Sequence, residues 1–243
     1  MAPLIIAHRG ASADAPENTL AAFELAYRQQ ADMIELDLQP TADGEIVVFH
    51  DDDTSRWNGR ADPVACLTLA ELRRLDIRGE RVPTLAETLD WARSAGMPLN
   101  LELKKPGLAA RCVQLLREFG MVDQVIVSSF FPQALRELRA VDPAIARGYL
   151  MGIRTYRPDV RLREFWPFGA LRRIGAAAWH PYHGLPGLDW VLPKVRRAGY
   201  QVNVWTVDDP DRLRALATLG ASGLITNTPA AARAALAGVL PQR

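Results

Sequence analysis

The sequence predicts an α/β protein, a TIM (β/α)8 barrel with an inserted segment at the barrel mouth after the second strand. Short apolar runs rich in β-branched residues alternate with helical patterns nearly to the end of the 243-residue chain, and this alternation is typical of a parallel sheet. About eight such runs are present, the number that a barrel of roughly 250 residues requires. The expected barrel strands are Leu4–His8, Met33–Leu38, Leu99–Lys104, Val125–Phe130, Ala146–Leu150, Ala176–His180, Gln201–Val207 and Gly223–Thr226.

The helices expected between these strands carry apolar residues three or four positions apart, as Leu85, Leu89 and Ala92 do. Polar residues that can cap the first turn of a helix precede three of these segments. These residues are Asn18 or Thr19, Thr84, and Asp208 or Asp209.

One stretch after the second strand interrupts the alternation. Residues 41–45 carry a hairpin turn signal, and we expect the following strand Ile46–Phe49 to act as a flap that returns the chain to the barrel mouth at His50. Residues 51–83 are rich in Asp, Arg, Gly and Pro, and a long insertion at the mouth usually serves as a wall or lid. We therefore expect residues 1–243 to form a single barrel domain with an insertion over about 51–83.

The composition excludes several classes of protein. A formal net charge of +1 and a pI near 7.8 provide no global basic field, so nucleic acid is not expected as a partner. Cys66 and Cys112 match neither a disulfide framework nor a zinc site. The first residues lack the charged region of a signal peptide, and no apolar run approaches the roughly 18 residues of a membrane span. We expect a cytoplasmic protein without stable membrane association; the oligomeric state stays open.

Two of the expected strands place charged residues on a single face. Glu35 and Asp37 alternate with apolar residues in one strand, and Glu102 and Lys104 do so in another. Buried charge costs several kcal/mol, roughly, unless it is paired or holds a metal. Because the three acids exceed the two nearby bases, Arg9 and Lys104, we expect an oxygen-ligand site for Mg²⁺ or Ca²⁺ rather than a salt-bridge cluster.

Two histidines stand where strands end. His8 closes the first strand, and His50 follows the flap strand. The carboxyl ends of strands carry the chemistry of α/β enzymes. A metal site flanked by two histidines suits cleavage of a phosphate diester, which needs a base for the attacking hydroxyl and an acid for the leaving alkoxide. Arg9 and Lys104 would hold the remaining phosphate oxygens.

These motifs resemble the glycerophosphodiester phosphodiesterases, in particular the small cytoplasmic bacterial members. The matching segments, in order, are His8-Arg9-Gly10, Pro16-Glu17-Asn18-Thr19, Glu35-Leu36-Asp37, His50-Asp51, Leu101-Glu102-Leu103-Lys104, Ser128-Ser129-Phe130, Trp205-Thr206-Val207 and Thr226-Asn227-Thr228. The resemblance spans nearly the whole chain.

The resemblance implies metal-dependent hydrolysis of glycerophosphodiesters to glycerol 3-phosphate and an alcohol. It implies roles for eight residues: metal binding by Glu35, Asp37 and Glu102, acid–base catalysis by His8 and His50, phosphate contacts from Arg9 and Lys104, and a hydrophobic wall for the glycerol from Trp205. Two rivals are a lysophospholipase D-like activity on lysophospholipids and a non-catalytic phosphate-binding barrel. The preferred alcohol, the native metal and the formation of a cyclic phosphate intermediate stay open.

Some residues carry weaker expectations. Asp208 stands where the family often has Asn, and we expect it only to cap a helix. Glu17 either braces Arg9 or lies near a helix N-terminus. His180 and His183 are expected to serve loop structure rather than substrate contact.

The segment Arg154–Arg173 combines arginines with Phe165, Trp166 and Phe168. It could meet a lipid surface or steer an anionic substrate, but we expect a solvated helix that packs its aromatic side chains inward.

Overall fold

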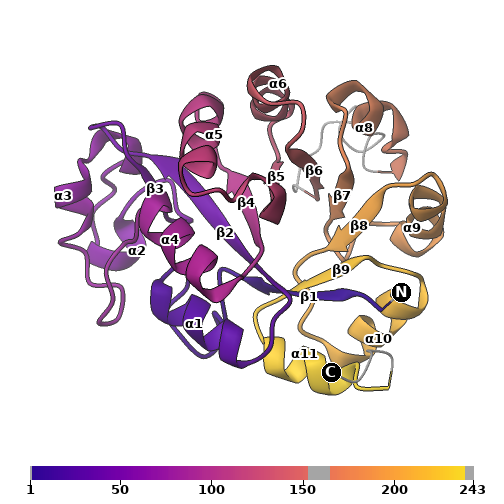
Figure 1. Ribbon diagram of the computed structural model, residues 1–243. Helices are drawn as coiled ribbons and strands as arrows, with labels where there is room; N and C mark the ends of the chain where they lie inside the picture. The colour runs from indigo at the N-terminus through magenta and orange to yellow at the C-terminus, as the bar shows by residue number, and fades with distance from the viewer. Residues whose placement is uncertain (1, 153–164, 239–243) are drawn as a thin grey trace.

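The computed structural model describes residues 2–152 and 165–238 (Figure 1). Within these residues, eight parallel strands close a barrel in the order β1-β2-β4-β5-β6-β7-β8-β9, with β9 pairing back to β1. The barrel strands are β1 (Leu4–His8), β2 (Met33–Pro40), β4 (Leu99–Leu103), β5 (Val125–Ser129), β6 (Ala146–Met151), β7 (Ala178–Pro181), β8 (Gln201–Val204) and β9 (Gly223–Thr226). The predicted TIM barrel is thereby confirmed.

The expected strands all form, and the differences lie at their ends. β7 starts two residues later than expected, because Gly175 ends the preceding helix in the left-handed region and the chain needs a short return to the barrel. β8 ends at Val204, and Trp205 continues only as an isolated bridge to Tyr182. Of these two differences, only the early end of β8 lies at the mouth of the barrel.

The helices surround the barrel (Figure 1). They are α1 (Leu20–Arg28), α4 (Leu85–Ala95), α5 (Ala109–Glu118), α6 (Pro132–Val141), α8 (Phe168–Ile174), α9 (Leu188–Arg197), α10 (Pro210–Thr218) and α11 (Pro229–Ala235), with a short 3-10 turn η2 (Val122–Gln124) before β5. Thr19, Thr84 and Asp209 cap α1, α4 and α10 through their side chains. Asp208 does not cap a helix, contrary to our expectation, because its carboxylate binds Thr226 and Asn227 instead.

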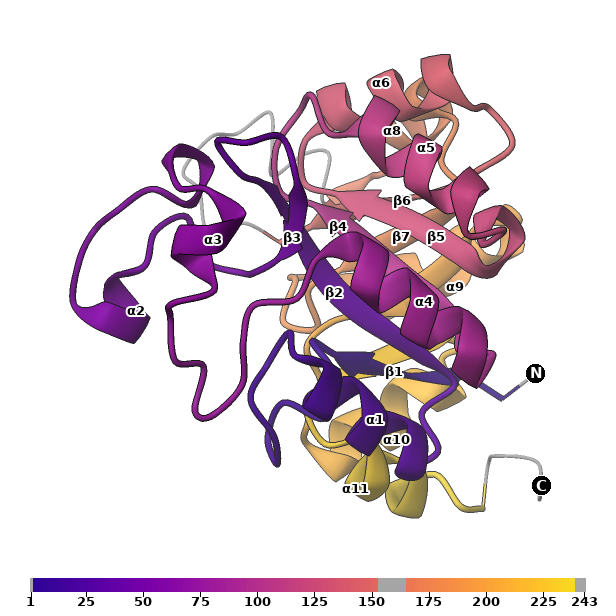
Figure 2. The ribbon, with the colours of Figure 1, turned by 60° about the vertical axis from the view of Figure 1, so that its left-hand side comes forward.

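The flap strand β3 (Ile46–Val48) pairs antiparallel with β2, with Leu38 opposite Val48. This hairpin returns the chain to the mouth at His50, as predicted. The insertion that follows contains α2 (Ser55–Asn58), the 3-10 turn η1 (Val64–Cys66) and α3 (Leu69–Leu72), and it lies beside β3 on one side of the barrel (Figure 2). A small hydrophobic cluster of its own stabilises it, formed by Val47, Phe49, Val64, Leu72, Leu75, Ile77 and Val82.

The main core divides into two hydrophobic clusters that follow the order of the chain. One contains buried residues between Ala7 and Ile145, and the other contains Ile5 and buried residues between Leu135 and Leu236. Each cluster joins one half of the strands to their covering helices. The two halves of the barrel thus have largely separate apolar cores.

The aromatic segment before α8 differs from our expectation. Residues 154–164 lie outside the described residues. Phe165 and Trp166 are 47% and 48% exposed, and both rings contact the exposed Trp190 at centroid distances of 5.7 and 6.0 Å. The expectation of inward packing is wrong for these two side chains because their rings pack against Trp190 at the surface instead of against the barrel core.

No helix in the described part of the chain combines the length and the apolar character needed to cross a bilayer.

Candidate active site at the barrel mouth

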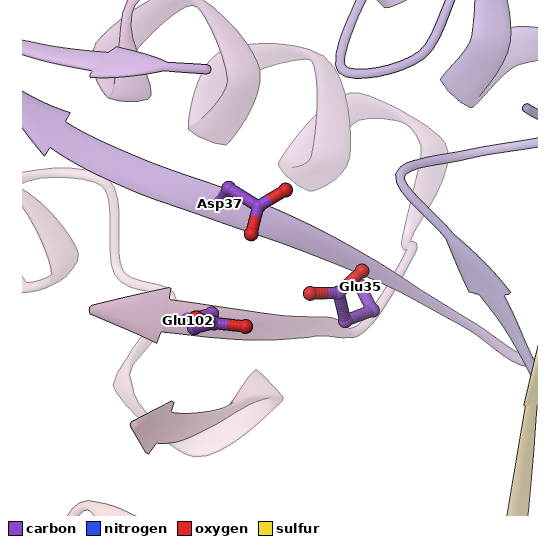
Figure 3. A group of neighbouring side chains, drawn as sticks. All are labelled: Glu35, Asp37 and Glu102. Atoms are coloured by element: carbon purple, nitrogen blue, oxygen red, sulfur yellow. The ribbon is translucent and has the colours of Figure 1, made fainter. Parts of the chain in front are cut away.

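Three buried carboxylates form a cluster inside the barrel. Glu35 and Asp37 project from β2, and Glu102 projects from the neighbouring β4, where it is the register partner of Asp37 (Figure 3). One oxygen from each carboxylate lies within 4.8 Å of those of the other two. The alternation of a β-strand explains the arrangement, since Glu35 and Asp37 are two residues apart and share the inner face.

Two cations contact the cluster from the mouth. Arg9 Nε lies 3.2 Å from Asp37 Oδ2, and Lys104 Nζ lies 3.4 Å from both Asp37 Oδ1 and Glu102 Oε1. The Asn18 carboxamide donates to Asp37 Oδ2 at 2.9 Å. Arg9 and Asn18 both have φ near +57°, in the left-handed region that non-glycine residues seldom adopt. Such conformations cost about 1–3 kcal/mol each, so the surrounding contacts must hold these two side chains against Asp37.

The pKa values show that the two cations do not neutralise the three acids. Burial opposes the ionisation of Asp37, but Arg9 and Lys104 outweigh it and hold the Asp37 pKa well below its usual range. Burial and the charge of Asp37 raise the pKa of Glu102 to about 7, and burial with both neighbouring carboxylates raises that of Glu35. A further cation would stabilise all three carboxylates in the ionised form. The all-oxygen donor set fits a hard divalent ion.

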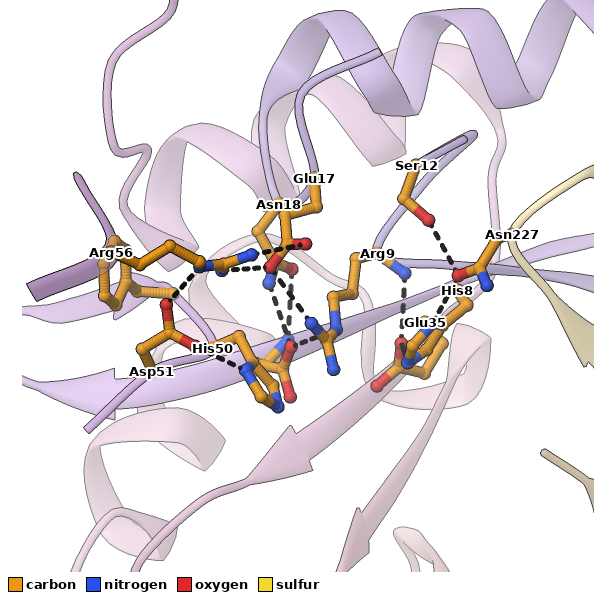
Figure 4. A network of polar contacts seen from close by, with 12 residues as sticks. His8, Arg9, Ser12, Glu17, Asn18, Glu35, His50, Asp51, Arg56 and Asn227 are labelled. Atoms are coloured by element: carbon orange, nitrogen blue, oxygen red, sulfur yellow. Dashed lines mark hydrogen bonds and ion pairs between the residues drawn. The ribbon is translucent and has the colours of Figure 1, made fainter. Parts of the chain in front are cut away.

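His8 is held by Asn227, which directly follows the last barrel strand β9 (Figure 4). Its Nδ1 lies 2.7 Å from Asn227 Oδ1, while Asn227 Nδ2 donates to Asp208 Oδ2 at 2.6 Å. Because Asp208 orients the carboxamide with its oxygen toward His8, the proton sits on Nδ1 and the Nε2 lone pair is free. Nε2 lies 4.0 Å from Glu35 Oε2. Ser12 Oγ donates to the same Asn227 oxygen at 2.9 Å, so nothing activates it as a nucleophile.

His50 has a charged partner instead of an amide. Its Nδ1 lies 2.8 Å from Asp51 Oδ1, and Arg56 Nε donates to Asp51 Oδ2 at 2.6 Å (Figure 4). Arg56 also binds Glu17, which accepts a hydrogen bond from Arg9 Nη1 at 3.0 Å. Glu17 therefore braces Arg9, the first of the two roles considered for it, and links both histidine-bearing loops.

One cavity of about 80 Å³ unites the predicted site residues. A polar side contains both histidines, and an apolar wall includes Phe130 and Trp205, whose ring centroids are 5.5 Å apart at an interplanar angle of 85°. The lining residues are His8, Arg9, Glu35, His50, Asn100, Glu102, Lys104, Phe130, Leu150, Trp205 and Ile225. Of the predicted site residues only Asp37 is missing from this lining, because Arg9, Asn18 and Lys104 cover its carboxylate.

His180 differs from the loop residue that we expected. It lies within β7, fully buried, and its Nε2 is 3.0 Å from Asn203 Nδ2, while its backbone oxygen accepts from Trp205 Nε1 at 2.9 Å. Burial lowers the pKa of His180 to about 3. Its backbone therefore orients the cavity wall through Trp205. His183 lies in the following loop, as expected.

Sequence reasoning missed Asp208 as a partner of Asn227, Asn18 as a partner of Asp37, and Asn100 in the cavity lining. Asn18 and Asn227 stand inside recognised motifs, but a motif does not indicate which side chain a residue contacts. Asn100 alternates with Glu102 in β4, and this inward position is the signal that could have identified it.

Comparisons with known proteins agree with this geometry. The sequence model of the glycerophosphoryl diester phosphodiesterase family matches residues 8–231. A glycerophosphodiester phosphodiesterase of Caldanaerobacter subterraneus subsp. tengcongensis is 32% identical over 244 residues, which cover 94% of this chain and 96% of that protein.

Solved structures show the same fold. A phosphodiesterase of Oleispira antarctica, solved in complex with its product sn-glycerol-3-phosphate, superposes with a TM-score of 0.81 at 31% identity and covers 97% of each chain. A glycerophosphodiester phosphodiesterase of Agrobacterium tumefaciens has a TM-score of 0.79 at 28% identity and covers 96% of this chain and 99% of its own. The chain therefore belongs to the glycerophosphoryl diester phosphodiesterase family.

Proposed function

We propose that this protein hydrolyses glycerophosphodiesters to glycerol 3-phosphate and an alcohol, using a divalent cation, Mg²⁺ or Ca²⁺, held by Glu35, Asp37 and Glu102. The observation that carries the proposal is the meeting of these carboxylates with two histidines and two cationic side chains at one cavity. The product bound to the Oleispira antarctica relative supports the choice of substrate. The test is release of glycerol 3-phosphate from a soluble glycerophosphodiester by the purified protein with each cation in turn.

The phosphate group is expected to sit in the cavity, next to the bound cation and to the side chains of Arg9 and Lys104. Arg9 and Lys104 both line the cavity, and their N–H groups can donate to the oxygens of a phosphodiester. When bound, the cation neutralises negative charge that develops on the phosphate in the transition state. The apolar face of Trp205 would bound the glycerol carbons.

The groups that bind Nδ1 of each histidine indicate which histidine acts as the base and which as the acid. The amide oxygen of Asn227 fixes the His8 tautomer with a free Nε2, which suits a base that takes a proton from the attacking hydroxyl. Burial lowers the pKa of His50, and the carboxylate of Asp51, which faces its Nδ1, acts in the opposite direction. This carboxylate partner, which His8 lacks, suits an acid that protonates the leaving alkoxide. Asn227 and Asp51 are positioning residues in this scheme.

We expect the glycerol 2-hydroxyl to attack phosphorus, because the described residues of the site include no activated protein nucleophile. The hydroxyl proton passes to the base, the bond from phosphorus to the alcohol oxygen breaks, and a cyclic phosphate forms that water then opens. Proximity of an internal nucleophile can contribute on the order of 7 kcal/mol. A substrate whose glycerol lacks the 2-hydroxyl is therefore expected to bind but scarcely turn over, as measured by alcohol release.

A competition assay provides the control for this prediction: the 2-deoxy analogue should inhibit hydrolysis of the parent diester, and the cyclic glycerol phosphate should be accepted or trapped. Turnover of the analogue at a rate near that of the parent would indicate attack by water and contradict the internal nucleophile.

Lysophospholipids are a second substrate class to compare. The cavity volume of about 80 Å³ and its charged lining support a small soluble diester. Parallel assays with a soluble diester and a lysolipid separate the two activities. A binding-only barrel would retain the diester without releasing product.

A further inference from the structure

We propose that Asn100 is a specificity-determining residue that hydrogen-bonds the terminal hydroxyl of the glycerol group, the hydroxyl farthest from the phosphate. This inference rests on the proposed function. It names the part of the substrate that would bind at the inner end of the active-site cavity. Glu102, Lys104 and the histidines do not need Asn100 for the roles described above.

The position of Asn100 places its carboxamide beside the carboxylates. It is the register partner of Glu35 across β2 and β4, and it precedes Glu102 by two residues on the inner face of β4. Successive residues of a strand rise by about 3.3 Å, so Asn100 lies roughly 6.6 Å before Glu102 along β4 and deeper in the barrel. Its side chain is fully buried and lines the cavity.

The carboxamide of Asn100 has unused hydrogen-bonding capacity. Among the described residues, neither its Nδ2 nor its Oδ1 has a partner. Leaving a buried polar group unsatisfied costs about 1–3 kcal/mol, and buried amides are therefore nearly always paired with protein, water or ligand. A ligand in the cavity can supply both missing partners.

The chemistry of the amide selects the kind of ligand group. It offers N–H donors and an oxygen acceptor. A phosphate diester only accepts hydrogen bonds and a cation only takes lone pairs, so either of them alone would leave one half of the amide unsatisfied. A hydroxyl donates and accepts, and it satisfies both halves.

The dimensions of the cavity agree with this placement. A cavity needs about 10–15 Å³ to hold one water-sized group, and the volume here of about 80 Å³ accommodates several linked groups of that size. With the phosphate near Arg9 and Lys104, the glycerol carbons extend along Trp205 and the terminal hydroxyl reaches the depth of Asn100.

The test combines a change in the enzyme with a change in the substrate. kcat/KM is measured for the wild type and for Asn100→Ala, each with a glycerophosphodiester and with the matching diester of propane-1,2-diol, which keeps the 2-hydroxyl and lacks the terminal one. The wild type is expected to prefer the glycerol diester by at least about tenfold. Asn100→Ala is expected to lose that preference and to treat the two diesters within about threefold of each other.

Ser128→Ala is the matched control. Ser128 is also fully buried with an unpartnered side-chain oxygen in the described structure, but it does not line the cavity, so its variant should keep the wild-type preference. Asn100→Ser serves as a second variant should the alanine protein fold poorly. Cation affinity and melting temperature are measured for each protein to separate loss of fold from loss of recognition.

An unchanged preference in a folded Asn100 variant, with both diesters slowed equally, would overturn the proposal and assign Asn100 a structural role. An equal rate for both diesters in the wild type would overturn it as well. Failure of the wild type to hydrolyse the glycerol diester would instead contradict the proposed function. In that case the binding constants of glycerol phosphate and of propanediol phosphate, each measured for the wild type and for Asn100→Ala, decide the role of Asn100.

Discussion

Replacing either His8 or His50 by alanine is expected to lower the rate of diester hydrolysis by about 10² to 10⁴, the usual scale for a general acid or base. Cation binding should stay nearly intact, because neither imidazole belongs to the carboxylate cluster. Steady-state kinetics together with calorimetric titration of the metal separate the two effects. Activity equal to that of the wild type in either variant would remove that histidine from the mechanism.

The choice of leaving group distinguishes the two roles. A diester that releases nitrophenol needs little help from an acid, because nitrophenolate is a stable anion. His50→Ala should therefore recover most of its lost rate on such a substrate, whereas His8→Ala should stay slow on both. The reverse result would exchange the assignments of acid and base. His183→Ala provides a matched control, since His183 lies outside the cavity lining and its loss should leave both rates unchanged.

Removing the divalent cation is expected to abolish turnover, because Arg9 and Lys104 alone leave the three carboxylates incompletely neutralised. Replacing Glu35, Asp37 or Glu102 by its amide should weaken cation binding and lower kcat, with partial recovery at high metal concentration. Full activity in chelator-treated protein that is verified to be metal-free would contradict the assignment of the site.

The same acids should destabilise the metal-free fold. The pKa of Glu102, raised to about 7 by burial and by Asp37, indicates that the buried carboxylate is poorly accommodated when charged. The folded state then binds a proton more tightly than the unfolded chain, so metal-free stability falls as the pH rises from about 4.5 to about 7. Glu102→Gln should raise the melting temperature of the metal-free protein at neutral pH, and added Mg²⁺ or Ca²⁺ should stabilise the wild type more than the variant at the same concentration. A lower melting temperature for the amide variant would show that Lys104 depends on Glu102.

The sequence predicted the barrel well because parallel strands in a barrel interior are short apolar runs, and the exceptions to that pattern marked the site. Glu35, Asp37 and Glu102 stood out as charges within such runs, and the structure brings them together. The return of His50 followed from a turn signal next to a strand. These features depend on local periodicity, which a single sequence displays directly.

The remaining features depend on side chains that meet from distant parts of the chain. Asp208 resembled a helix cap because its neighbours begin α10, but Asn227, nineteen residues later, determines what its carboxylate binds. Phe165 and Trp166 resembled an inward helix face, but their rings meet the exposed Trp190 from a later helix. Asn100 carries no charge, so its alternation with Glu102 was passed over in a strand where charge was the criterion. Tertiary contacts decided each of these cases.

The division of the hydrophobic core into an early and a late half has a consequence for synthesis on the ribosome. The carboxylates lie in β2 and β4, while β9, which closes the barrel against β1, lies more than a hundred residues later. At roughly 5–20 residues per second, β9 follows β4 out of the ribosome about 6–24 s later. Until β9 is available to pair with β1, the barrel wall around the carboxylates is incomplete. We expect a cation to reach these acids more readily during that interval than in the closed barrel.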